Sequence, residues 1–232
     1  MWKGLDLLFP PSCGGCEKIG ERWCNYCHQN LTHFSVSICD VCGEPQKAAG
    51  ICKQCQLSRP PYKALRSWVV FKEPVRAAIH KLKYRQDIGL GEALALPMAH
   101  YIQALNWDIE AIVPVPLSSE RFAERGYNQV ALIARPLAMI HKWHYMPGAL
   151  QRIKHTRSQV GLTIDERREN VQNAFRANPR LIRNKKILLM DDVATTRSTL
   201  TSASRELVAA GASDVYVLTA ARAISERKLA IA

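Results

Sequence analysis

Eight cysteines in the first quarter of the chain are the residues best suited to hold metal ions. They form four Cys-x-x-Cys pairs, all before residue 56: Cys13/Cys16, Cys24/Cys27, Cys39/Cys42 and Cys52/Cys55. Each pair presents two thiolates from one tight turn, and two such turns complete the tetrahedral set that zinc prefers. Disulfides are the alternative, but two-residue spacing within every pair favours metal binding. We therefore expect two zinc sites.

The order of the cysteine turns leaves two ways to build these sites. Pairing in sequence order joins the first two turns across a seven-residue loop and the last two across a nine-residue loop. An interleaved pairing is the alternative. Either arrangement fills every ligand position with sulfur, so the zinc is expected to stabilise the fold rather than to take part in a reaction.

A doubled acid followed by hydroxyl side chains is the second pattern that could do chemistry. Residues 187–200 read ILLMDDVATTRSTL, in which an apolar run leads to Asp191 and Asp192 and then to a helix start rich in Ser and Thr. At the carboxyl end of a parallel strand, loop amides and a helix N-terminus favour an anion. Carboxylates there suit sugar hydroxyls or a magnesium ion. The pattern favours a phosphorylated ribose as ligand, and the alternative is that the acids only cap a turn.

The elements that must position these residues alternate along the second part of the chain. Cysteines stop at residue 55 and a Pro-Pro pair follows, so we predict a zinc domain over residues 1–60 and a larger domain over residues 61–232. Apolar patterning predicts strands at 67–71, 111–115, 186–190 and 215–219, and helices at 74–82, 89–105, 128–140, 170–175 and 199–210. Such alternation indicates an α/β fold with a mostly parallel sheet flanked by helices.

Composition indicates a globular protein with a positive field. The 232 residues are 47% hydrophobic and carry a formal net charge of +12. Most of that excess lies after residue 60, where 26 Lys and Arg face 15 Asp and Glu. Such a field attracts phosphates, whether in nucleotides or in nucleic acid. No run approaches the roughly 18 apolar residues of a membrane span, and the opening residues lack the apolar length of a signal peptide, so we expect a cytoplasmic protein.

Several motifs together resemble the ComF family of competence and DNA-utilisation proteins, which includes GntX-like members. Residues 187–200 are similar to the phosphoribosyl-pyrophosphate (PRPP) loop of type I phosphoribosyltransferases, Asp-Asp-Val-x-Thr-Thr-Gly-x-Thr, with Arg197 at the usual glycine. Residues 113–129 (VPVPLSSERFAERGYNQ) and 152–175 (RIKHTRSQVGLTIDERRENVQNAF) are similar to further ComF segments. The resemblance covers nearly the whole chain. It implies an N-terminal double zinc ribbon joined to a type I phosphoribosyltransferase-like domain.

The resemblance also implies roles for single residues. Asp191 and Asp192 would be the catalytic pair that holds the ribose hydroxyls, with magnesium bound alongside PRPP. The 5-phosphate would lie among Thr195, Thr196, Arg197, Ser198 and Thr199, and the pyrophosphate near Ser118, Arg121 and Arg125. A basic flap would include Arg152, Lys154 and Arg157.

A separate basic cluster with an aromatic side chain can be recognised from the residues alone, without the family resemblance. Lys81, Lys83, Tyr84 and Arg85 are suited to phosphate contact and base stacking, and are candidates for nucleic-acid binding. The alternative is a helix end whose charged heads reach into solvent. Arg121 and Arg125 have a similar alternative, because residues four apart can form a solvated helix face.

The function implied by the resemblance is handling of transforming single-stranded DNA in the cytoplasm, beside a helicase and an inner-membrane DNA channel. A PRPP-type site would accompany it. The alternative is an active phosphoribosyltransferase, in which an acceptor attacks the anomeric carbon and pyrophosphate leaves. A structural adaptor that docks through its zinc turns is the third hypothesis.

Overall fold

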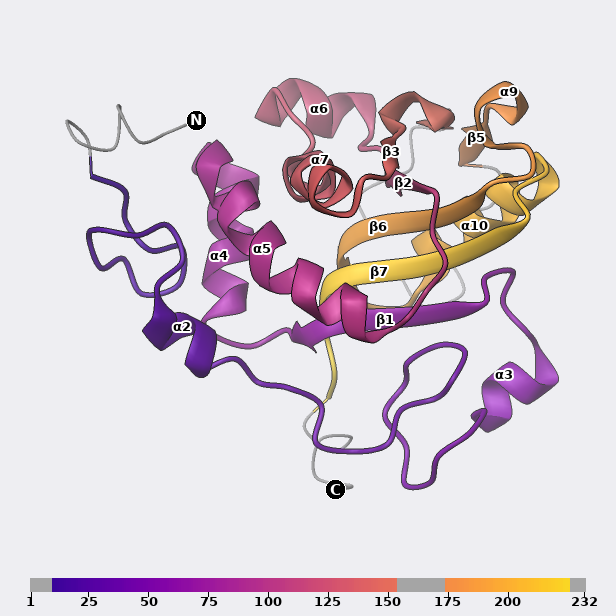
Figure 1. Ribbon diagram of the computed structural model, residues 1–232, viewed down its shortest axis with the longest axis horizontal. Coiled ribbons are helices and arrows are strands. Elements are labelled where there is room, and N and C mark those ends of the chain that lie inside the picture. The colour runs from indigo at the N-terminus through magenta and orange to yellow at the C-terminus, as the bar shows by residue number, and fades with distance from the viewer. Residues whose placement is uncertain (1–9, 154–173, 226–232) are drawn as a thin grey trace.

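The structure is a computed structural model that describes residues 10–153 and 174–225 (Figure 1). Five strands form one sheet in the order β1-β7-β6-β2-β3, and neighbouring strands in it pair in parallel. These strands are β1 (Ala64–Val70), β2 (Ala111–Pro114), β3 (His144–Tyr145), β6 (Lys186–Ala194) and β7 (Asp214–Arg222). The expected α/β fold with a mostly parallel sheet flanked by helices is confirmed.

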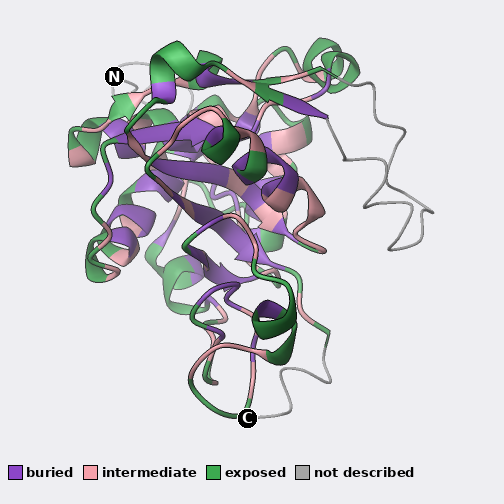
Figure 2. Ribbon diagram, turned by 90° about the vertical axis from the view of Figure 1, so that its right-hand side faces the viewer, coloured by how far each residue is buried: buried purple, intermediate pink, exposed green. Residues whose placement is uncertain are grey.

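Helices cover both faces of the sheet because strand residues alternate between two apolar cores. Leu188 and Met190 of β6 belong to the core shared with α4 (Val75–Tyr84), α5 (Ile88–Ala104) and α7 (Gln129–His141). Ile187 and Leu189 face the opposite core, which contains α10 (Ser198–Ala209). Figure 1 shows α5 and α7 in front of the sheet and α10 behind it. A parallel sheet needs apolar cover on both faces, and its strands are buried along most of their length (Figure 2).

The predicted elements recur with shifted ends, and the end of one predicted helix is wrong. A helix was expected at 170–175, but Phe175 begins β5 (Phe175–Ala177), which pairs antiparallel with β4 (Leu150–Arg152); residues 170–173 lie outside the described residues. Strand β6 is longer than expected, because its pairing with β7 continues past both aspartates to Ala194. Pairing with a distant segment overrides the local apolar spacing in both cases.

Shorter elements complete the described chain. They are α2 (Asn25–Gln29), α3 (Lys53–Leu57), α6 (Ser119–Arg125), α9 (Pro179–Ile182) and the 3-10 turn η1 (Pro147–Ala149). No helix in residues 10–153 or 174–225 combines the length and apolar composition that crossing a membrane requires.

The cysteine-rich region packs along β1, the edge strand of the sheet. The N–H of Leu65 donates to the carbonyl of Val41 at 2.7 Å, and the N–H of Val70 donates to Thr32 at 2.9 Å. Cys39, Cys42 and Cys55 lie in the same apolar core as Leu65. The region therefore covers main-chain groups that an exposed edge would offer to another strand.

Arg222, the last residue of β7, is a buried polar link between the cysteine-rich region and the sheet. The residue is 1% exposed, and its side chain donates to the carbonyl of Cys42 at 2.9 Å and to Glu44 Oε2 at 2.7 Å. Gly43 lies between these partners with φ +64, and a Cβ there would lie 2.6 Å from the Leu65 carbonyl oxygen. The turn after Cys42 is thus fitted to the end of the sheet at close range.

Replacing Arg222 with methionine tests this link. We expect Arg222→Met to lower the free energy of unfolding by about 3 kcal/mol, because it removes one partner of a buried pair and leaves the Cys42 carbonyl without this donor. The measurement is urea denaturation of the zinc-loaded protein. Lys63→Met is the matched control: its ion pair with Asp214 is more than half exposed on the lysine side, so its loss should cost less than about 1 kcal/mol. Equal effects of the two substitutions would contradict the assignment.

Candidate functional site

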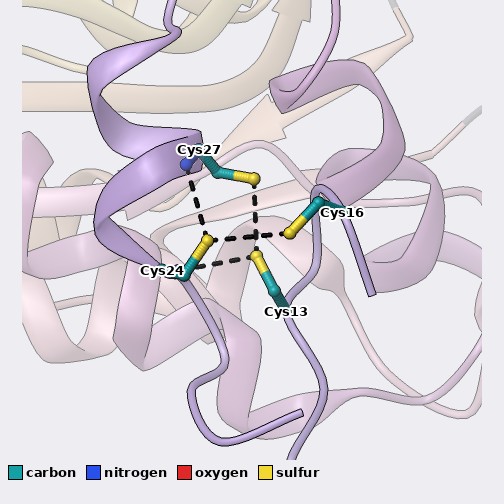
Figure 3. Close-up of side chains that lie close together, drawn as sticks. All are labelled: Cys13, Cys16, Cys24 and Cys27. Carbon is teal, nitrogen blue, oxygen red and sulfur yellow. Dashed lines mark hydrogen bonds between the residues drawn. The ribbon is translucent and has the colours of Figure 1, made fainter. Parts of the chain in front are cut away.

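The cysteine sulfurs gather in two clusters, each from two consecutive turns. Cys13, Cys16, Cys24 and Cys27 form the first cluster (Figure 3), and Cys39, Cys42, Cys52 and Cys55 form the second. All four sulfurs of a cluster lie within 4.8 Å of one another. The Sγ atoms of Cys13 and Cys27 are 3.6 Å apart, and those of Cys42 and Cys52 are 3.7 Å apart. Four sulfurs at about 2.3 Å from a zinc ion would be about 3.8 Å apart, so both clusters fit zinc and the sequential pairing is confirmed.

Backbone N–H groups point at the leading sulfur of each cluster. Cys13 Sγ accepts from the N–H of Gly15 at 3.4 Å and of Cys24 at 3.5 Å, and Cys39 Sγ accepts from the N–H of Cys52 at 3.3 Å. Burial acts to raise the pKa of Cys13, but these donors outweigh it and bring that pKa to about 6. The same balance brings the pKa of Cys39 to about 6. These donors thus stabilise the thiolate form of Cys13 and Cys39, which is the form that binds zinc, while burial raises the pKa of Cys27 and of Cys55 in the same clusters.

The two aspartates after the apolar run of β6 lie beside side chains from α4 and α7. Asp192 is 8% exposed, and its Oδ2 accepts from Lys83 Nζ at 2.9 Å and from Gln129 Nε2 at 2.7 Å. Strand β2 ends alongside, since Pro114 pairs with Met190. The carboxyl ends of two parallel strands therefore meet where the acids lie, which is where open α/β sheets bind ligands.

Gln129 links Asp192 to Arg125, which the sequence predicts as a site residue. Arg125 Nη1 donates to Gln129 Oε1 at 2.8 Å, and the Arg125 guanidinium lies over the Tyr84 ring, 5.1 Å from its centroid. Sequence reasoning missed Gln129, although it stands four residues after Arg125 in the same RGYNQ segment. That spacing within a shared motif was the available signal. Lys83, Tyr84 and Arg125, predicted separately, are brought together here.

The surroundings of Asp191 contain groups that raise its pKa and groups that lower it. Burial and the charge of Asp192 raise the pKa of Asp191 to about 7, while Lys83 and Arg152 act in the opposite direction. Arg152 belongs to β4 and lies over the Phe175 ring of β5. Burial and the charge of Arg121 lower the pKa of Arg152. Near neutral pH, Asp191 can therefore accept or release a proton.

Residues 195–199 span the turn before α10 and the first two residues of that helix, and the side chain of Arg197 points away from this segment. Arg197 has φ 66°, the left-handed conformation that glycine adopts without strain. Its Nη2 donates to Gln54 Oε1 at 3.3 Å, in α3 beside the second cluster. Burial lowers the pKa of Arg197, but the charges of Cys42 and its neighbours raise it overall. The backbone thus keeps the shape expected of the family glycine while the side chain turns toward the zinc region. Within the loop, Thr196 Oγ1 and Ser198 Oγ are 3.2 Å apart.

The segment after β2 is held by its own polar residues. Ser118 caps α6 by accepting from the N–H of Arg121 at 3.4 Å. The Asn128 side chain donates to the Val115 carbonyl at 2.9 Å, and Tyr127 donates to the Leu82 carbonyl at 2.7 Å. These bonds fix the segment against the end of β2 and against α4, next to the acids.

The remaining predicted residues are placed less centrally. Lys81 does not face the acids; it donates to the Cys13 carbonyl at 3.0 Å and pairs with Glu17 at 3.4 Å. Arg85 and Thr195 are exposed, and Thr199 is half-buried. Lys154 and Arg157 lie outside the described residues.

Comparison with known proteins found relatives for the cysteine-rich region and for most of the chain. A family model described as "Double zinc ribbon domain" matches residues 4–56. Competence protein F of Haemophilus influenzae is 31% identical, covering 91% of this chain and 95% of that protein. DNA utilization protein YhgH of Salmonella typhimurium is 30% identical over 91% of this chain and 96% of its own length. Competence protein ComFC of Bacillus subtilis is 26% identical over 90% of this chain and 84% of its own. The chain belongs to the ComF family of competence and DNA-utilisation proteins.

Among solved structures, the chain is similar to the glutamine phosphoribosylpyrophosphate amidotransferase of B. subtilis complexed with ADP and GMP. The identity is 19% and the TM-score 0.37, with 62% of this chain and 27% of that longer chain covered.

Serine substitution of one cysteine tests the two clusters separately. We expect Cys39→Ser to lose one zinc of two per chain, since a hydroxyl is a poor replacement for a thiolate ligand, and to keep the first cluster loaded. The measurement is zinc per chain by elemental analysis after dialysis. His28→Ala is the control, because His28 is exposed and follows Cys27 directly yet belongs to neither cluster, so it should keep both zinc ions. Two zinc ions retained by Cys39→Ser would rule out the second site.

Proposed function

We propose that this protein handles single-stranded DNA in the cytoplasm during natural transformation, and that the site at the end of β6 binds a ribose phosphate of the PRPP type. The convergence of Asp191 and Asp192 with Lys83, Arg125 and Arg152 supports the proposal most directly. The names of its relatives, competence protein F and DNA utilization protein, agree with a role in DNA uptake. A helicase and an inner-membrane channel are the proposed neighbours in that process.

Different side chains of the site suit different chemical groups of the proposed ligand. Carboxylates accept hydrogen bonds, so Asp191 and Asp192 suit the ribose hydroxyls. Loop 195–199 and the start of α10 offer N–H groups and hydroxyls to the 5-phosphate. In the proposed arrangement Lys83, Arg125 and Arg152 supply positive charge for a pyrophosphate, and Asp191 with Asp192 could also hold a magnesium ion that neutralises part of its charge.

The same arrangement supports phosphoribosyl transfer as a second candidate function. An acceptor nitrogen would attack C1 of the ribose, the C1–O bond would break, and pyrophosphate would leave with the bonding electrons toward Lys83 and Arg125, while the acceptor N–H would release its proton to water. Carboxylates near the ring would stabilise the developing positive charge. The juxtaposition of acids and cations at one strand end favours this chemistry; pyrophosphate release in the presence of nucleobases would test it.

The raised pKa of Asp191 makes ribose-phosphate binding depend on pH. With a pKa of about 7, the ionised fraction of Asp191 rises roughly tenfold from pH 6 to pH 8, so affinity for ribose 5-phosphate with magnesium should rise with pH by up to that factor. Isothermal titration calorimetry at pH 6, 7 and 8 measures it. In Asp191→Asn the affinity should be lower and this pH dependence absent, apart from ionisation of the ligand phosphate.

Asp108→Asn is the matched control for this test. Asp108 precedes β2 at the opposite end of the sheet and is exposed, so its removal should leave both affinity and pH profile unchanged. Equal pH profiles in wild type and Asp191→Asn would contradict the proposed role of Asp191.

Binding of single-stranded DNA tests the other half of the proposal. Tyr84 is 61% exposed beside Arg125, so it can stack on a base. Tyr84→Ala should weaken binding of an oligothymidylate by about 1–3 kcal/mol, and wild-type affinity should fall steeply with salt. Fluorescence anisotropy measures both. Tyr26→Ala, which removes a similarly exposed tyrosine from α2, should leave affinity unchanged. An affinity that does not vary with salt would refute DNA binding through phosphates.

A further inference from the structure

We infer that the hollow between the first zinc turn (residues 13–17) and α4 is a pocket for one unpaired base of a DNA single strand. The hollow has a volume of about 520 Å³, within the range of roughly 300–1,000 Å³ typical of small-molecule sites. Its walls come from the zinc turn, from the segment between β1 and α4, and from α4 with Arg85 after it. The inference rests on the proposed handling of single-stranded DNA and names where the strand is held.

Flat and apolar groups line part of this hollow. Phe71, His80 and Tyr84 contribute three rings, and Ala77 contributes a methyl group. Tyr84 is 61% exposed, but its ring contacts the His80 ring, with centroids 4.7 Å apart, and the guanidinium of Arg125. These contacts restrict the ring before any ligand arrives. A base that stacks on it therefore gains contact with little further loss of side-chain freedom.

Most charged groups of the hollow are paired with one another, so the interior suits an uncharged ligand group. Lys81 pairs with Glu17 at 3.4 Å, and Arg76 pairs with Glu73 at 3.9 Å. The two carboxylates would repel a phosphate placed among them. The polar edge of a base carries both N–H donors and acceptors, so it can bond to the acids and to the cations of these pairs.

Arg85 at the rim supplies positive charge for the phosphate next to such a base. It is exposed, and across residues 10–153 and 174–225 it forms no ion pair. Lys83 also lines the hollow, but its ammonium pairs with Asp192 at 2.9 Å. The strand would therefore place its phosphate against an unpaired cation outside and its base between paired charges inside.

The first zinc turn is fitted closely to α4 and to the segment before it. Lys81 Nζ donates to the Cys13 carbonyl at 3.0 Å. A Cβ at Gly15 would lie 2.7 Å from Pro74 Cβ and 2.7 Å from Cys27 Sγ, so glycine is what allows this approach. Because the turn is held by the cluster, the shape of the hollow depends on an intact first cluster.

The hollow is distinct from the ribose-phosphate site. Lys83 is the one residue of that proposed site that also lines the hollow; Asp191, Asp192, Arg152 and residues 195–199 do not. Ala77 lies six residues before Lys83 on α4, so the hollow can be filled without altering the ribose-phosphate site.

The test fills the hollow while every charge and every ring stays in place. Ala77 is half-buried, so the added ring of Ala77→Phe would occupy the space of the base. In the full, zinc-loaded chain we expect Ala77→Phe to weaken binding of fluorescein-labelled oligothymidylate by about tenfold, the effect of losing one stacked base. Ala104→Phe is the matched control: Ala104 is exposed on α5 and does not line the hollow, so wild-type affinity should remain.

A second variant tests the rim, and zinc content shows whether the first one folds. Arg85→Gln should reduce the slope of log affinity against log salt by about 0.7, the loss of one phosphate contact. An unchanged slope would remove Arg85 from the strand's path and contradict the inference. If Ala77→Phe retains fewer than two zinc ions per chain, Ala77→Leu, which adds less volume, takes its place and should weaken binding in the same direction.

The outcomes separate this inference from the proposed function. Ribose 5-phosphate with magnesium should bind Ala77→Phe as tightly as wild type; a parallel loss would overturn the inference of a separate pocket. If wild type binds no oligothymidylate, the proposed DNA handling fails and the inference fails with it. If wild type binds and Ala77→Phe binds equally well, the hollow takes another occupant, such as a protein segment. The inference is then wrong while the proposed DNA handling stands.

Discussion

Strand β6 makes main-chain hydrogen bonds along both edges, to β2 and to β7, and packs on both faces. Its pairing with β7 continues past the apolar residues through Asp191 to Ala194, which carries the acids to the carboxyl edge of the sheet. Because β2 ends beside Met190, the segment containing Ser118 and Arg125 follows from the same edge. The register of one central strand thus determines where the acids lie, where loop 195–199 begins and which way α10 runs.

The zinc clusters act as parts of this framework. The second cluster shares an apolar core with β1 and is joined to β7 through Arg222, and the first is joined to α4 through Lys81. Each cluster also lies beside a hollow. The second cluster borders a hollow beside α10. Gly14, Gly15 and Glu17, which flank the first cluster, border another hollow of about 520 Å³ beside α4. Zinc binding, which contributes to folding free energy, therefore bears on surfaces outside the cysteine turns.

Two surroundings of different chemistry border the segment that follows β6. Toward β2 and α7 lie Asp191 and Asp192, and Lys83 and Gln129 hold the carboxylate of Asp192. Toward the linker, the segment meets arginines and hydroxyls with no carboxylate lining the space. Arg197 belongs to the second environment, because its left-handed backbone conformation sends the side chain to Gln54. Arg197, which stands where the family usually has glycine, adopts the left-handed conformation that glycine allows. Its side chain places a positive charge beside Gln54 of α3.

Cysteine spacing, the apolar runs and the doubled acid before a Ser/Thr-rich helix start were sufficient to predict two four-cysteine clusters, an α/β fold and the position of the acids at a strand end. These are properties of short segments, since a Cys-x-x-Cys turn, a buried strand and a helix start are each determined by residues close together in the sequence. The tertiary structure decided which turns share an ion, that Phe175 lies in a strand, and that Gln129 and Lys83 hold Asp192. It also decided that Arg222 is buried against Cys42, 180 residues away. Contacts between residues so far apart leave no local pattern, because they depend on how strands pair and helices pack after the chain has folded.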